Sequence, residues 1–128
     1  MTAAKHSVPV TAILWICQIL AAGVFLYYGF LKLTGNPGMV GLFEEIGFGQ
    51  WFRYVTGAIE VTSAVLLLIP AWSPFGAALL ACTMIGGILA HLLVLHAPLT
   101  NPVTMLALVS VVLWLRRSQI KAFTASAI

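Results

Sequence analysis

The chain has 128 residues, of which 62% are hydrophobic and only 7% are charged. Soluble domains carry about 25% charged residues, so this chain lacks the polar side chains that a water-facing surface needs. This composition excludes an ordinary soluble globule, a disordered segment, a coiled coil and a nucleic-acid-binding module. The net charge of +3 comes from scattered basic residues and a scarcity of acids, and it does not indicate a nucleic-acid partner. The sequence predicts an all-α protein whose partner is the lipid bilayer.

Four apolar segments are candidates for membrane spans. A helix that crosses about 30 Å of hydrocarbon needs roughly 20 mostly apolar residues. We predict spans over residues 10–31, 52–69, 74–95 and 98–115, which together make one transmembrane domain over residues 1–128. The first is expected to be a retained helix, because its apolar stretch exceeds the roughly 7–15 residues of a signal peptide. The expected fold is an integral membrane four-helix bundle.

The basic residues near the ends of the spans predict the orientation of the bundle. Four spans put both termini on one side, whose basic residues are Lys5, Arg116, Arg117 and Lys121. The first loop and its flanks hold only Lys32 and Arg53. Because basic residues concentrate in cytoplasmic flanks, both termini are predicted to be cytoplasmic.

The long connection between the first two spans contains a helix-start signature. Asn36 can cap a helix whose first position is Pro37. The apolar residues that follow share one face, with Glu44 and Glu45 on the other; they are Met39, Val40, Leu42, Phe43 and Ile46. This spacing predicts a short amphipathic helix in the outer interface. Nearby glycines leave a solvated loop as the alternative.

Glu60 is the most informative residue, because it interrupts an apolar span near the bilayer midplane. At 1.5 Å per residue it lies roughly 12 Å below the outer boundary of its helix. An acid at that depth faces the bundle interior or a wet cavity, and it marks a functional site by default. The alternative is an acid that is hydrogen-bonded to neighbouring helices and only fixes their packing.

His91 is the partner that the sequence favours for Glu60, because their expected axial offset is only about 4–5 Å. Arg53 lies on the face of Glu60 about 10 Å higher, so direct contact is doubtful. Tyr28 and Lys32 are one turn apart in the same outer half. These five side chains are the candidate ligand-binding site. The alternatives are a core histidine at 91, an interface aromatic at 28 and headgroup snorkelling for the two cations, which we favour for Lys32.

A metal site is not predicted. His91 and His96 are five residues apart, whereas two ligands on one helical face are three or four apart. The glycines at 86 and 87, with Gly23 and Gly29, predict close helix contacts, either within the bundle or between subunits of a homo-oligomer.

The residues that carry the site resemble a known family. The segments 32–37 (KLTGNP), 43–54 (FEEIGFGQWFRY) and 56–60 (TGAIE) are similar to those of DoxX-like membrane proteins. The resemblance covers nearly the whole chain and implies a small four-helix protein of the bacterial inner (plasma) membrane. The family name comes from a subunit linked to thiosulfate oxidation with quinone as acceptor. Some relatives are associated with membrane redox complexes, and distant animal relatives are regarded as receptor-assembly chaperones.

Three functional hypotheses follow from the residues and the resemblance. The first is an accessory membrane subunit of a quinone-linked redox complex, with a lipophilic ligand near Glu60 and His91. The second is an assembly factor that recognises another membrane protein. The third is an intramembrane enzyme or small-molecule carrier that uses Glu60 for proton transfer. We favour the first, because the chain carries no cofactor motif that would make it an independent enzyme.

Reporter fusions test the predicted orientation. A reporter at Ile128 should give a cytoplasmic signal and one at Gly47 an external signal, because basic flanks stay inside. An external signal at Ile128 would contradict the orientation with four spans.

Overall fold

The computed structural model describes residues 7–127, which fold almost entirely into helices. Lys5, which entered the orientation argument, lies outside these residues. The described helices are α1 (Val8–Thr34), α2 (Pro37–Ile46), α3 (Gln50–Leu68), α4 (Ser73–Ala90), the π-helical turn η1 (His91–Leu95), α5 (Thr100–Leu115) and α6 (Arg117–Ala127).

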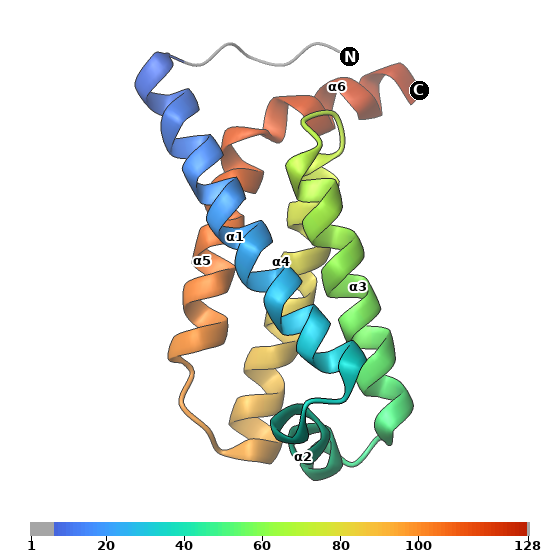
Figure 1. The fold of residues 1–128 in the computed structure, drawn as a ribbon. Helices are drawn as coiled ribbons and strands as arrows, with labels where there is room; N and C mark the ends of the chain where they lie inside the picture. The colour runs from blue at the N-terminus through green and yellow to red at the C-terminus, as the bar shows by residue number, and fades with distance from the viewer. Residues whose placement is uncertain (1–6, 128) are drawn as a thin grey trace.

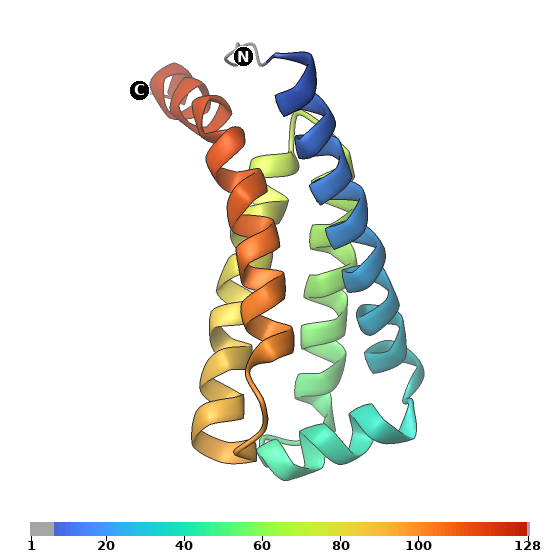
Figure 2. The same cartoon turned by 90° about the vertical axis from the view of Figure 1, so that its left-hand side faces the viewer.

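Four of these helices form an up-and-down bundle, as Figures 1 and 2 show. Helix α1 packs against α3, α3 against α4, α4 against α5, and α5 closes the ring against α1. Successive members run antiparallel because each connection returns the chain to its neighbour. The predicted four-helix bundle is confirmed. We call its two ends the α2 end and the α6 end, after the helix that lies across each (Figure 1).

The helices differ in how well they match a bilayer. Helices α1 and α3, and α4 together with η1, are each long and apolar enough to cross a membrane. Helix α5 has 16 residues, or about 24 Å, which is less than the hydrocarbon thickness. It reaches a full span only together with α6, from which it is bent by 55°. The described residues therefore contain three spans by length and composition, or four if α5 and α6 count as one.

The predicted amphipathic helix is confirmed as α2. The backbone N–H of Gly38 donates to Asn36 Oδ1 at 3.0 Å, which is the expected N-cap. Before it, Gly35 ends α1 in the left-handed conformation (φ 75°), which glycine adopts without steric cost. On α2 itself, Phe43 is buried against the bundle, whereas Glu44 and Glu45 are exposed. The helix thus lies flat against the end of the bundle.

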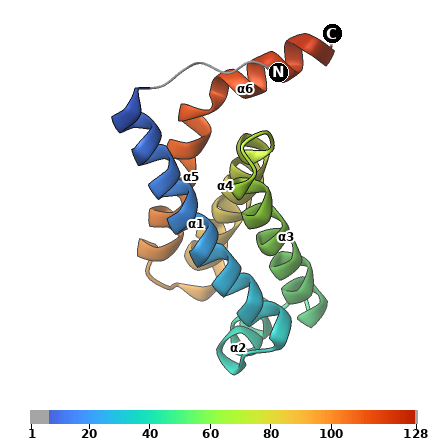
Figure 3. The ribbon, with the colours of Figure 1, turned by 45° about the horizontal axis from the view of Figure 1, so that its top comes forward.

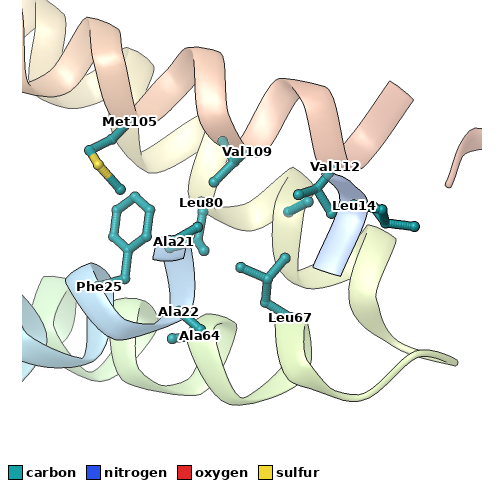
Figure 4. Packing of buried hydrophobic residues seen from close by; sticks show 11 residues of the cluster. Leu14, Ala21, Ala22, Phe25, Ala64, Leu67, Leu80, Met105, Val109 and Val112 are labelled. Carbon is teal, nitrogen blue, oxygen red and sulfur yellow. The ribbon is translucent and has the colours of Figure 1, made fainter. Parts of the chain in front are cut away.

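The apolar core fills the bundle between its middle and the α6 end. Figure 4 shows side chains from α1, α3, α4 and α5 converging there. Leu67, Leu80 and Val109 are each 0% exposed, as a close-packed interior requires. Many large apolar side chains point outward instead, which suits a surface solvated by lipid.

Small residues bring α3 close to both of its neighbours. A Cβ added to Gly29 would lie 2.6 Å from Val61 Cγ2, and one added to Gly57 would lie 3.0 Å from Lys32 Cβ. On the other side of α3, a Cβ on Gly76 would lie 2.6 Å from the Ser63 carbonyl oxygen. Membrane helices approach closely where side chains are small, because packing rather than hydrophobic burial holds them together.

The close contact predicted within the bundle at the glycine pair of α4 does not form, and Gly23 makes none either, whereas contacts between subunits at these glycines stay a prediction. A Cβ on Gly86 or on Gly23 would meet no atom within 4 Å, and one on Gly87 would make only an ordinary contact, at 3.8 Å, with Pro102. Glycine spacing alone could not separate these positions from Gly29, because the crossing points of the helices depend on the whole bundle.

Two matched substitutions within α4 test this packing. Gly76→Ala should destabilise the bundle by about 1–3 kcal/mol, because the new methyl group collides with the backbone of α3. Gly86→Ala should leave stability unchanged or raise it slightly, since its space is open and alanine favours helix. Thermal unfolding in detergent measures both, and equal losses would contradict the contact at Gly76.

Candidate functional site

A buried ion pair joins α1 to α3 in the half of the bundle nearer the α2 end. Lys32 Nζ lies 2.8 Å from Glu60 Oε1, and the two side chains are 10% and 2% exposed. The sequence favoured headgroup snorkelling for Lys32, and this prediction is wrong, because the lysine side chain points into the bundle and pairs with Glu60. The partner of Glu60 in this structure is Lys32, whereas the sequence favoured His91.

The directions of the two helices explain why these side chains meet. Side chains on a helix tilt toward its N-terminus. Lys32 lies near the end of α1 and so tilts back into the bundle, whereas Glu60 on the antiparallel α3 tilts toward the α2 end. The close approach at Gly29 and Gly57 then leaves a gap that the lysine can span. The pair follows from helix direction and backbone distance together.

Arg53 donates hydrogen bonds to groups at the helix ends and not to the carboxylate of Glu60. Its Nη1 donates to the backbone carbonyl of Lys32, in the last turn of α1, where carbonyls lack helical partners. Its Nε donates to Gln50 Oε1 at 2.7 Å, and Gln50 Nε2 donates to the Val40 carbonyl at 3.1 Å. This series of hydrogen bonds joins α1, α2 and α3. Gln50 was missed at the sequence level because one exposed-looking amide carries no recognisable pattern.

A cavity of about 610 Å³ lies beside the ion pair. Four of the five candidate site residues line it, namely Tyr28, Lys32, Glu60 and His91, while Arg53 does not. The Lys32 ammonium is also 5.9 Å from the centre of the Tyr28 ring. Most of the remaining wall is apolar and comes from α2, α3, α4, η1 and α5.

His91 stands at the start of the π-helical turn. Its Nδ1 lies 2.9 Å from the Pro98 carbonyl oxygen, and because a carbonyl only accepts, Nδ1 carries the proton of this bond. A neutral ring then has Nε2 as an acceptor. Short π-helical segments often occur at functional sites, where they redirect side chains. Coupling between His91 and Glu60 stays a prediction.

The second carboxylate oxygen of Glu60 is buried without a hydrogen-bond donor among residues 7–127. An unsatisfied buried acceptor normally costs about 1–3 kcal/mol, and more when it is charged. Such groups are rare in folded proteins and call for an explanation such as a water, an ion or a ligand. Within the same residues, no three His, Cys, Asp or Glu side chains gather in a group that could hold a metal. The hydroxyl oxygens of Ser63 and Ser73 are also buried without a partner among these residues. Of the three residues, Glu60 is the one that lines the cavity, so a hydrogen-bonding ligand there would account for its orphaned oxygen.

Sequence reasoning missed most of the apolar wall. The inward face of α2 contributes Met39, Leu42, Phe43 and Ile46, and α4 contributes Gly86 and Gly87. The apolar face of α2 was visible in its spacing, but nothing in the sequence showed that it closes the end of a cavity. The two glycines leave room where larger side chains would fill the space.

Comparison with known proteins shows which family this chain belongs to. The model of the DoxX-like family matches residues 16–115, which include all five candidate site residues. The chain belongs to the DoxX-like family. A protein of Bacillus subtilis (strain 168) named "Putative oxidoreductase CatD" is 28% identical over 74 residues. These residues are 58% of this DoxX-like chain and 55% of that relative, so the match spans about half of each. No solved structure matches the chain.

A double-mutant cycle tests the ion pair in the ligand-free protein. Lys32→Met and Glu60→Gln should each cost about 3–5 kcal/mol of unfolding free energy if the other charge stays buried and unpaired. The double variant should lose much less than the sum, and denaturation in detergent measures all three.

The matched control is the same cycle with His91→Gln in place of Lys32→Met. Because His91 bonds to Pro98 and not to Glu60, the losses of unfolding free energy caused by the His91 and Glu60 substitutions should add to within about 0.5 kcal/mol. Additivity for Lys32 and Glu60 would show that the pair does not hold the two helices.

Proposed function

We propose that this DoxX-like protein binds a lipophilic quinone-type compound in its cavity, as a membrane subunit of a redox complex. The observation that carries the proposal is the orphaned Glu60 Oε2, a buried acceptor on a residue that lines a largely apolar cavity. If the carboxylate turns this oxygen toward the cavity, a ligand that donates a hydrogen bond to it would remove the cost of leaving it unpaired.

The size and lining of the cavity support a small ligand. Ligand pockets typically enclose about 300–1,000 Å³ and combine apolar walls with a few fixed polar groups. This cavity, at about 610 Å³, lies within that range. Among its polar groups, Lys32 and Glu60 are held by the ion pair and His91 by the bond to Pro98. A ring with a polar substituent at each end fits this distribution.

The hydrogen-bonding roles favour the reduced, hydroxyl-bearing form of such a ring. Paired with Lys32, Glu60 presents Oε2 as an acceptor, and the ring of His91, with its Nδ1 proton bonded to Pro98, presents Nε2 as another when it is neutral. Two hydroxyl groups can donate to these atoms, whereas two carbonyl oxygens cannot. Oxidation of a bound quinol to the quinone would pass two electrons to the redox partner, and Glu60 and His91 would take up the two hydroxyl protons.

The rims of the cavity support access from the bilayer. Val55 and Ile59 on α3, with Leu89 and Leu93 on the facing wall, line the cavity and are also 40–71% exposed. Helix α2 contacts both α3 and η1, so it covers the end of the cavity that faces the aqueous boundary. A ligand with an isoprenoid tail could leave that tail in the hydrocarbon while its ring occupies the cavity.

The redox assignment is supported by the family and by the name of the relative, which contains the word oxidoreductase. A dehydrogenase recovered with the protein from mild detergent would support it. Recovery of a channel or receptor would favour the assembly-factor hypothesis instead. A bound lipid-like molecule that turns over without a partner would favour the enzyme or carrier.

Ligand binding can be tested with paired glycine variants. A short-tailed ubiquinol analogue should raise the unfolding temperature of the wild-type protein in detergent, by an amount that grows with ligand concentration. Gly86→Leu fills the cavity wall and should abolish the shift, whereas Gly23→Leu, also in open space but outside the cavity, should keep it. Equal shifts for both variants would contradict binding in this cavity.

The polar groups can be tested by coupling. Glu60→Gln and His91→Gln should each weaken quinol binding at least tenfold, and the matching quinone should bind more weakly than the quinol to the wild-type protein. If the two residues hold one ligand, the losses in binding are non-additive although their losses in stability add. Unchanged affinity in Glu60→Gln would refute the role of the orphaned oxygen.

A further inference from the structure

The end of the bundle opposite α2 carries a separate feature, the helix α6. Its axis turns away from that of α5 at Arg116, so that α6 extends across the end of the bundle (Figures 1 and 3). Phe123 packs edge-on against Phe75 of α4 at a centroid distance of 5.2 Å, which fixes the far part of the helix. Helix α6 is therefore docked on the bundle.

A partly buried hydrogen-bond network holds the bend. Arg116 Nε donates to Gln18 Oε1 at 2.6 Å, and its Nη1 donates to Gln119 Oε1 at 2.8 Å. Gln119 Nε2 in turn donates to the Pro70 carbonyl in the turn between α3 and α4, at 2.7 Å. Arg116 is thus engaged within the protein, and the direction of α6 is fixed by contacts to three other parts of the chain.

Two cations remain on the outside of this docked helix. Arg117 and Lys121 are both exposed and lie one turn apart on the same face of α6. The three acidic residues of the chain are Glu44 and Glu45 on α2, at the opposite end, and the paired Glu60. No carboxylate side chain at the α6 end therefore neutralises these cations.

Exposed tryptophans accompany the cations. The Arg117 guanidinium carbon lies 4.0 Å from the centre of the Trp114 ring, and Trp114 is 64% exposed. Trp72, in the turn beside this end, is 52% exposed. Exposed tryptophans next to lipid-facing helices are typical of the headgroup level of a bilayer.

We infer that Trp114, Arg117 and Lys121 form a binding site for the phosphate of an anionic phospholipid in the leaflet around the α6 end. Arg117 Nη1 donates to the Trp114 carbonyl at 2.6 Å, which leaves the Nε and Nη2 edge of the guanidinium for phosphate. That edge can bind phosphate through two parallel hydrogen bonds, and the lysine adds a point charge one turn away. Trp114 belongs to α5, whose exposed Val111 lies one turn earlier, so the site continues into the lipid-facing surface. That continuity favours a lipid over an acidic protein segment, which would approach from water.

Lipid binding can be measured on the full chain purified in neutral detergent. Phosphatidylglycerol should bind with a defined stoichiometry by native mass spectrometry, and phosphatidylcholine should bind at least tenfold more weakly. Arg117→Gln with Lys121→Gln should lower the affinity for phosphatidylglycerol about 30-fold, from about fivefold per basic residue at an anionic surface. Equal binding of the two lipids, or an unchanged double variant, would overturn the proposal.

Two controls separate lipid from other anions and from misfolding. Arg117→Lys with Lys121→Arg keeps both charges and should keep most of the affinity, whereas Glu44→Gln with Glu45→Gln should change nothing. Inorganic phosphate at the same concentration should not displace the lipid; displacement would show a site for free phosphate. Both side chains are exposed, and Arg117 makes one exposed hydrogen bond, to the Trp114 carbonyl. The double glutamine variant should therefore unfold close to the wild-type temperature in neutral detergent, and a large decrease would show a structural role instead.

Discussion

The contact between α1 and α3 at Gly29 and Gly57 is the constraint on which the rest of the structure depends. It brings the two backbones close enough for Lys32 to reach Glu60, and it buries most of this pair away from solvent. A buried ion pair often contributes little net stability, but breaking it leaves an isolated charge at high cost. The pair therefore fixes the relative position of two helices more than it strengthens the bundle. The wall of the cavity is built on that fixed position.

The two halves of the bundle use their space differently. Toward the α6 end, fully buried side chains such as Leu67 and Leu80 close the interior. A hydrogen-bond network joins Gln18, Arg116 and Gln119 there, while the hydroxyl oxygens of Ser63 and Ser73 lack a partner among the described residues. Toward the α2 end, Gly86 and Gly87 of α4 have no side chains to fill the cavity, and Oε2 of Glu60 lacks a donor among the described residues. A rigid half thus supports a half that retains open space, which is the arrangement that a preformed ligand site needs.

Charge separates the two ends in the same way. The exposed acids lie on α2, and the exposed cations of the described chain lie on α6. The remaining described cations, Lys32, Arg53 and Arg116, are engaged by a carboxylate, a backbone carbonyl and two glutamines. At the α6 end, Arg117 Nη1 donates to the Trp114 carbonyl at 2.6 Å, but the side chains of Arg117 and Lys121 are exposed and face the surroundings of the protein. The other three described cations serve its architecture.

The sequence by itself determined the membrane class, the helical bundle and the amphipathic α2, because hydrophobicity, helix periodicity and the Asn36 cap are local properties. It also placed Tyr28, Lys32, Glu60 and His91 in one half of the bundle, since rise per residue sets depth. Only the tertiary structure decided that Lys32 pairs with Glu60, that His91 bonds to Pro98, and that Gly29 and Gly76 make contacts which Gly86 does not. These outcomes depend on how far each helix is rotated about its axis and where it crosses its neighbours. Contacts between residues far apart in the chain fix both, and no local pattern encodes them.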